Sequence, residues 1–150
     1  MKLAEALQAR ADLKRQINQL EYRLTSNALV QEGENPNEKP GDLFKEFNKS
    51  LEEMEKLIVR INLTNSVEMV EGKTLTELIA ERDVLKQKIA TYRNVVNEAS
   101  SNTSRATRTE IKVLPTINVE SFQKDIDKMS KQLRELDNKI QEANWTIELK

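Results

Sequence analysis

The sequence contains no cysteine and no histidine among its 150 residues, and these absences exclude several kinds of chemistry. Without cysteine there is no disulfide and no thiolate nucleophile. Without histidine there is no imidazole general base, and zinc and haem sites with the usual ligands are excluded too. Only hard cations held by carboxylate and carbonyl oxygens remain compatible with the composition. We therefore predict no metal, no cofactor and no catalytic residue, and the composition favours a protein that is not an enzyme.

Glycine and proline are also scarce, with three of each, and aromatic residues make up only 4% of the chain. These counts are too low for a loop-rich or β-rich fold. Charged residues reach 33%, which is typical of long helices with large solvated faces. Such helices form thin bundles with little core, and these often gain stability by pairing with copies of themselves. We predict a single, mainly α-helical domain over residues 1–150 that forms a homo-oligomer, either a dimer or a larger assembly.

The net charge is −1, and acidic and basic residues are interspersed along the chain. There is no basic stripe, so the electrostatic signature of nucleic-acid binding is missing. The N-terminal residues MKLAEALQARADLKR lack the apolar region of a signal peptide. No apolar run approaches the ~20 residues that span a bilayer. We therefore expect a cytoplasmic protein with no nucleic-acid partner and no membrane location.

Residues 75–100 are predicted to form the helix around which the chain is organised. Its apolar residues recur at alternating spacings of three and four, which is the a/d seam of a coiled coil. Arg82 interrupts this seam at an a position, between Glu81 and Asp83. Thr74 and Glu77 form a capping-box pattern that places the start of the helix. The seam consists of Leu75, Leu78, Arg82, Leu85, Ile89, Tyr92, Val96 and Ala99.

The same spacing predicts helices over residues 2–26, 42–62 and 119–149, with Asp42 as the N-cap of the second. Together with residues 75–100 they indicate an antiparallel four-helix bundle of coiled-coil helices. In residues 42–62 the seam consists of Phe44, Phe47, Leu51, Met54, Ile58 and Ile61, with Asn65 next in phase. Residues 28–41 hold two prolines and two glycines and are predicted to be a solvated loop. The alternative for this acidic loop is an oxygen-ligand metal site, although its spacing matches no EF-hand.

A small two-stranded β element is predicted from residues 66–70 and 110–114. Val67, Met69 and Val70 alternate weakly with polar residues, and Glu71–Gly72 follows as a turn. The first half of residues 101–118 is rich in serine, threonine and asparagine. A second, weakly alternating apolar stretch follows and ends at Pro115. Pairing the two strands satisfies both backbones. In an up-down bundle they lie at opposite ends, so we favour pairing between antiparallel subunits. The alternative is that residues 101–118 run back along the bundle.

Seven polar residues are predicted to gather at one end of the bundle if the four helices alternate in direction. The favoured interpretation is a buried network that fixes helix register and oligomeric state. The alternative is a binding or catalytic pocket, with Glu81 or Asp83 as base or metal ligand and Arg10 or Arg82 as anion clamp. If the helices are arranged differently, the cluster does not form. The seven residues are Arg10, Asn62, Asn65, Glu81, Arg82, Asp83 and Asn144.

A second set of residues is predicted to form contacts between subunits. Trp145 falls at an f position, which faces water in an isolated bundle. A lone exposed tryptophan marks a packing contact more often than a ligand site. The apolar residues of the two predicted strands complete the set, because they would pair across the interface. The candidate interface residues are Trp145, Val67, Met69, Ile111 and Val113.

Six sequence blocks, in this order and spacing, resemble a family of small bacterial helical proteins known as septicolysins or as a domain of unknown function. The blocks cover nearly the whole chain and include all seven polar residues and Trp145. The family name implies a cytolysin, that is, a pore-forming protein. The blocks are MKLAEALQARADLKRQI, LVQEGENP, LIVRINLTNS, LTELIAERDVL, TEIKVLPTINV and RELDNKIQEANW.

Three functional hypotheses follow from the sequence. The first is a cytosolic homo-oligomeric helical protein that acts by protein–protein interaction. The second is a membrane-active helical oligomer, which the family resemblance implies. The third is a protein that binds a small ligand or a metal with the arginine, glutamate and aspartate side chains of the polar cluster; the sequence does not specify such a ligand.

Overall fold

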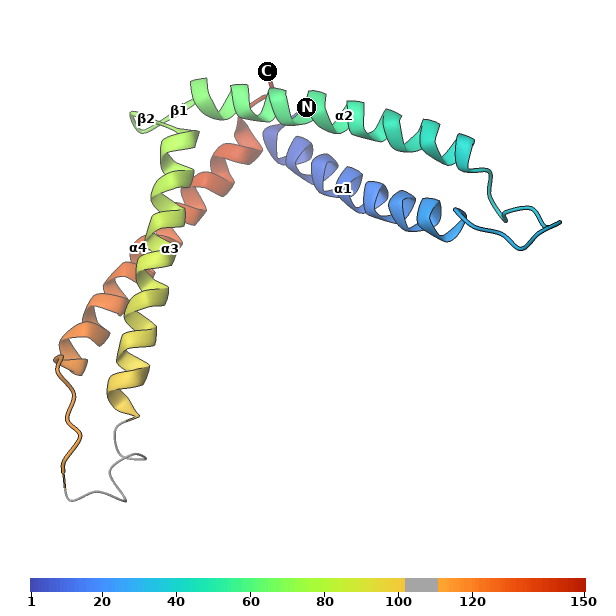
Figure 1. Ribbon diagram of the computed structural model, residues 1–150. Helices are drawn as coiled ribbons and strands as arrows, with labels where there is room; N and C mark the ends of the chain where they lie inside the picture. The colour runs from blue at the N-terminus through green and yellow to red at the C-terminus, as the bar shows by residue number, and fades with distance from the viewer. Residues whose placement is uncertain (102–110) are drawn as a thin grey trace. The chain divides into compact units, whose positions relative to one another are not determined.

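The computed structural model describes residues 1–101 and 111–150, and within them the protein is mainly α-helical (Figure 1). A small two-stranded antiparallel sheet accompanies the helices, as the sequence predicts. The elements in chain order are α1 (Leu3–Ser26), α2 (Pro40–Val67), β1 (Met69–Val70), β2 (Lys73–Thr74), α3 (Leu75–Ser100) and α4 (Val119–Thr146).

The chain groups into two compact units, and each is built on a pair of helices. Unit 1 comprises Met1–Glu68 and Ala143–Lys150, and unit 2 comprises Met69–Glu142. In unit 1, α1 and α2 run antiparallel: Gln16 contacts Glu46, whereas Arg23, later on α1, pairs with Glu38, just before α2 begins. In unit 2, α3 and α4 run antiparallel too: Arg82 lies near Asp137, whereas Arg93, later on α3, lies 3.4 Å from Ser130, earlier on α4. The single domain over residues 1–150 stays a prediction.

The buried face of α2 differs from the predicted seam. Phe44, Leu51 and Ile58 were expected in the core, but their side chains are 52%, 41% and 37% exposed. Ser50, next to Leu51, is buried instead. The apolar face of α2 is wide enough for two overlapping seams, and spacing alone does not select between them. The buried and half-buried residues on this face are Leu43, Phe47, Ser50, Met54, Leu57, Ile61 and Thr64.

Helix α2 is longer than predicted at both ends. It begins at Pro40 with Lys39 as N-cap, so the expected N-cap Asp42 lies in the first turn. Proline suits this position because its fixed φ is helical and its missing N–H would have no partner there. At the other end the helix continues to Val67. The Thr64 hydroxyl donates to the Arg60 carbonyl one turn earlier over 2.8 Å, so it does not take a backbone group away from the end of the helix. Val67 is therefore helical and lies outside the strand predicted for residues 66–70.

The sheet is a hairpin between β1 and β2, with Met69 opposite Thr74 and Val70 opposite Lys73. Its turn is Glu71–Gly72, as predicted, with φ of 51° and 86°, the positive values of a two-residue hairpin turn. Residues 111–114 of the predicted second strand are irregular here, and residue 110 lies outside the described residues. The local turn closes a much smaller loop than the about 40 residues that a pairing with residues 110–114 of the same chain would enclose. The favoured pairing between subunits stays a prediction. Residues 102–109 of the predicted non-helical stretch also lie outside the described residues.

The seams of α3 and α4 pack together as predicted. Ile89 and Val96 of α3 are buried in one cluster with Ile126 and Met129 of α4. The half-buried side chains around this cluster include an aromatic pair whose ring centroids are 5.3 Å apart, Tyr92 and Phe122.

The predicted capping box sets the start of α3. Thr74 Oγ1 accepts a hydrogen bond from the Glu77 backbone N–H over 3.2 Å, and the Glu77 carboxylate accepts one from the Thr74 N–H over 2.7 Å. Two backbone donors of the first turn are thereby satisfied. The hydrogen bonds from Thr74 lower the pKa of the Glu77 carboxyl, because they stabilise its charged form.

Helix α4 ends at Thr146, three residues before the predicted end at residue 149. The remaining residues pair with the N-terminal segment instead of continuing the helix. Leu3 N–H donates to the Ile147 carbonyl over 3.0 Å, and Leu149 N–H donates to the Met1 carbonyl over 2.9 Å. Lys2 and Glu148 thereby form an antiparallel bridge. This bridge occupies backbone groups that a longer helix would have used.

Candidate functional site

Arg82 lies on α3 in unit 2, and its side chain is only 23% exposed. Its Nε and Nη2 atoms each lie 3.0 Å from Asp83 Oδ1, and Nε lies 3.9 Å from Asp137 Oδ1 on α4. The arginine that interrupts the apolar seam is therefore neutralised by one carboxylate from its own helix and one from the facing helix. The sequence interpretation did not identify Asp137. Its position directly after the seam residue Leu136 was the available signal, since charges beside a seam often pair across it.

Two further ion pairs attach the hairpin to the same helices. Lys73 Nζ on β2 lies 2.7 Å from Glu81 Oε2 on α3, and Lys139 on α4 pairs with Glu71 in the turn. The hydrogen bond that Lys73 donates to Glu81 raises the pKa of Lys73, and the one that Lys139 donates to Glu71 raises the pKa of Lys139, because each stabilises the charged amine. Both amines therefore stay protonated at neutral pH, which excludes either of them as a neutral amine nucleophile.

These four residues line a pocket of about 210 Å³ between the hairpin, α3 and α4. Each lysine in the pocket is paired with a carboxylate, so the site offers no unmatched cation to an anionic ligand. No group of three or more acidic residues able to hold a metal ion occurs in residues 1–101 and 111–150. The geometry is that of a charge network that ties the hairpin to its helices. The other residues that line the pocket are Val70, Leu78, Gln132, Glu135 and Leu136.

The seven predicted cluster residues are divided between the two units. Glu81, Arg82 and Asp83 belong to unit 2, where Glu81 pairs with Lys73 rather than with Arg82. The other four belong to unit 1: Asn144 is buried, two are half-buried and Asn62 is exposed. The structure thus brings together Arg82 and Asp83, and a joint cluster of all seven stays a prediction. The two half-buried residues are Arg10 and Asn65.

The predicted interface residues all have exposed side chains. Trp145 is 63% exposed, as expected for an f position. The other four, from α2, the hairpin and the segment before α4, are exposed large apolar residues as well. A residue that contacts another subunit must be exposed in the isolated chain, and these residues meet that condition. Their role in an interface stays a prediction. The four are Val67, Met69, Ile111 and Val113.

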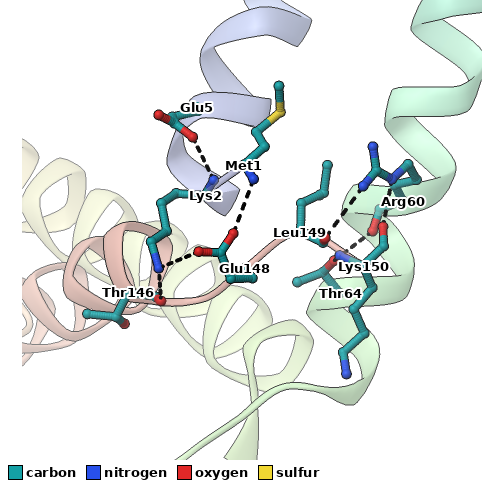
Figure 2. A network of polar contacts seen from close by, with 9 residues as sticks. All are labelled: Met1, Lys2, Glu5, Arg60, Thr64, Thr146, Glu148, Leu149 and Lys150. Carbon is teal, nitrogen blue, oxygen red and sulfur yellow. Dashed lines mark hydrogen bonds and ion pairs between the residues drawn. The ribbon is translucent and has the colours of Figure 1, made fainter.

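A network of polar contacts within unit 1 joins the two ends of the described chain (Figure 2). Glu148 lies at its centre: one carboxylate oxygen is 2.7 Å from Lys2 Nζ and the other is 3.1 Å from the amino group of Met1. Lys2 Nζ also donates to the Thr146 carbonyl over 2.9 Å. These contacts lower the pKa of the Glu148 carboxyl, the hydrogen bond from Lys2 most of all. The network holds the end of α4 against the start of α1.

The second half of this network fixes the last residues against α2 (Figure 2). Lys150 N–H donates to Thr64 Oγ1 over 3.0 Å, and Arg60 Nε donates to the Lys150 carbonyl over 2.7 Å. Thr64 is fully buried and both accepts and donates hydrogen bonds there. The sequence interpretation missed all of these residues. Partners separated by 86 to 147 positions have no local spacing signal, so no pattern in the sequence would have identified them.

In the part of the chain that the structure describes, no helix is long and apolar enough to span a membrane.

Known proteins similar to this chain share its fold without a described activity. A crystal structure of a functionally unknown conserved protein from Corynebacterium diphtheriae is 37% identical, with a TM-score of 0.94, and the match covers 100% of this chain and 99% of that one. None of the curated proteins matches. Residues 10–149 match a family of unknown function, and neither description mentions a cytolysin. The chain therefore belongs to the family of unknown function DUF6847.

Proposed function

We propose that this protein is a homo-oligomer that acts through protein–protein contacts. The observation that carries the proposal is the row of large apolar side chains that α2 leaves exposed beside the face it packs against α1.

These exposed apolar side chains have a structural origin in the helix pair. A helix that packs against a single neighbour buries one face only, so much apolar surface stays accessible. On α2 this surface includes Phe44, Leu51, Ile58, Val59, Leu63 and Val67. An apolar surface of this extent on a soluble protein supports association with another protein. A cytoplasmic location is part of the proposal and rests on the sequence alone.

The oligomeric state in solution tests this function. Size-exclusion chromatography with light scattering is run on the full chain over a range of micromolar concentrations. We expect a mass that is a multiple of 17.3 kDa. A mass of 17.3 kDa at every concentration would remove the basis of the proposal.

The alternative function is that of a membrane-active, pore-forming helical oligomer, which the septicolysin resemblance implies and the exposed apolar side chains of α2 favour. An amphipathic helix binds at the surface of a bilayer without spanning it. Release of a trapped dye from vesicles tests this alternative. Vesicles of neutral and of anionic lipid are compared over a range of pH. If no dye is released under any of these conditions, the membrane alternative is wrong.

A further inference from the structure

The last described residues complete unit 1 only after the chain has passed through unit 2. Ala143–Lys150 belongs to the same compact unit as Met1–Glu68, although the whole of unit 2 lies between them in the sequence. Ala143, Asn144 and Leu149 are buried there, so this piece contributes to the interior of unit 1. The name strap is used below for Ala143–Lys150.

Unit 1 holds the strap mainly through the strap's backbone. Leu3 N–H donates to the Ile147 carbonyl over 3.0 Å, and Arg60 Nε donates to the Lys150 carbonyl over 2.7 Å. Lys150 N–H donates to the hydroxyl oxygen of the buried Thr64 over 3.0 Å. A segment recognised in this way binds as an added strand, through main-chain groups that every peptide carries. The residues that hold it, called the slot below, are Met1, Lys2, Leu3, Arg60 and Thr64 (Figure 2).

Two side chains of the strap add specificity to these backbone contacts. Leu149 is only 8% exposed, so unit 1 covers a large apolar side chain at this position. Glu148 is exposed, and its carboxylate lies 2.7 Å from Lys2 Nζ. Neighbouring residues of an extended segment face opposite sides, which explains why one is buried and the other is not. The slot therefore suits an extended segment in which an acidic residue precedes a large apolar one.

We propose that the slot of one copy binds the strap of a second copy, so that two copies are joined by exchanged straps. This inference rests on the proposed function, and it names the segment that joins the copies. A second copy carries a strap of identical sequence, which fits every contact described above. Exchange therefore loses none of these contacts, and the swapping of an identical element is a low-cost route to a dimer.

The contacts that hold the strap are of a kind that opens locally. The ion pair between Lys2 and Glu148 joins exposed side chains, where water weakens the attraction. Among the large apolar side chains of the strap only Leu149 is buried, and Trp145 is 63% exposed. Segments with few buried apolar contacts open at a lower free energy than the rest of a domain. We therefore expect the strap to leave its slot while α1 and α2 stay paired.

Cysteines at the bridge between Lys2 and Glu148 test the exchange. Hydrogen bonds flank this antiparallel pair instead of joining it, and the Cα atoms of such pairs are about 4.5 Å apart, which suits a disulfide. The chain has no cysteine of its own. Lys2→Cys protein and Glu148→Cys protein are mixed, refolded together from urea and oxidised in a glutathione buffer. We expect a covalent dimer with one chain of each variant, at twice the mass of 17.3 kDa.

Two further variants control for geometry and for chance cross-linking. The double variant Lys2→Cys and Glu148→Cys in one chain is expected to form the disulfide, because the bridge places its two thiols together. Glu120→Cys has an exposed thiol at the start of α4, in unit 2, and is mixed with Lys2→Cys as a control. We expect no mixed-chain dimer there, because glutathione reverses disulfides that no structure holds together. Circular dichroism compares the helicity of every variant with that of the unsubstituted protein.

The outcomes separate this inference from the proposed function. If the double variant forms its disulfide but the mixed single variants give no mixed-chain dimer, the strap stays in its own copy and the exchange is wrong. An oligomeric mass of the unsubstituted protein in light scattering then leaves the proposed function standing, whereas a monomer at every concentration overturns both. A double variant that forms no disulfide, or a Glu120→Cys control that cross-links equally well, also overturns the exchange.

Discussion

Arg82 Nε on α3 lies 3.9 Å from Asp137 Oδ1 on α4, inside an otherwise apolar seam between the two helices. A slip of one helical turn would displace the partners by about 5.4 Å and break this contact. Leucine and isoleucine at neighbouring levels tolerate such a slip far better, because apolar contacts are not directional. The pair therefore supports the prediction that Arg82 fixes the register of its helices.

Replacement of the seam arginine tests this role. We expect Arg82→Leu to raise the free energy of unfolding by about 1 kcal/mol or to change the oligomeric state, because leucine completes the seam and Asp137 remains accessible to water. Urea titration and light scattering measure the two effects. Arg134→Leu, at an exposed position of α4, is the control and is expected to stay within about 0.5 kcal/mol. A loss of stability in Arg82→Leu with unchanged mass would argue against a register role.

Glu148 is expected to make the protein less stable in acid. Its pKa is lowered in the folded chain, first by the hydrogen bond from Lys2. The folded state then binds this proton less readily than the unfolded state. The contribution of the Glu148 carboxylate to the free energy of unfolding is therefore fully present above the usual glutamate pKa of about 4.3. It is lost as the pH falls through the lowered value. We expect Glu148→Gln to be less stable than the unsubstituted protein at pH 7, with the difference shrinking on acidification.

Urea titrations at neutral and acidic pH measure this difference for Glu148. The control is Glu52→Gln, at an exposed position in the middle of α2. A deficit of the Glu148 variant that is equal at both pH values would show that the carboxylate charge is not the cause.

Trp145 is the only tryptophan in the chain, which makes its fluorescence a direct probe of the predicted interface. Its side chain is 63% exposed, so we expect red-shifted emission at low concentration and a blue shift as the protein associates. Trp145→Ala is expected to shift the oligomer equilibrium toward smaller species in light scattering. Emission that does not change with concentration, together with unchanged mass in the variant, would exclude Trp145 from the contact.

The core of unit 1 depends on Leu20, which is 1% exposed on α1. We expect Leu20→Ala to lower the free energy of unfolding by about 2–5 kcal/mol, since it removes buried methyl groups and leaves a cavity. Tyr22 lies two residues away and is 74% exposed, so Tyr22→Ala is expected to cost less than about 0.5 kcal/mol. Thermal and urea unfolding compare the two variants. Similar losses would mean that the buried face of α1 is placed wrongly.

The predictability of the fold differed between elements for physical reasons. The start of α3 was predictable because Thr74 and Glu77 satisfy each other within one turn. The Glu71–Gly72 turn was predictable because glycine adopts positive φ easily. The partner of β1 within the chain, β2, was not predicted, because strand propensity near Ile111 said nothing about the shorter loop that competes for the same backbone groups.

The candidate site was predictable only in part. Arg82 stands out in the sequence as a charge within an apolar repeat, and its half-burial on α3 agrees with that signal. Its partner Asp137 lies 55 positions away, and Glu148 pairs with residues at the other end of the described chain. Contacts over such separations depend on how the helices fold back, which spacing within one helix does not encode.

The sequence by itself determined that the chain is helical and where most of its apolar faces lie, because a repeat of three and four residues is a property of the helix alone. It also excluded thiol and imidazole chemistry through composition. Only the tertiary structure decided which face of α2 is buried, with Ser50 inside and Leu51 outside. Both faces satisfy the same repeat, and the choice between them depends on what the neighbouring helix and the last residues of the chain cover.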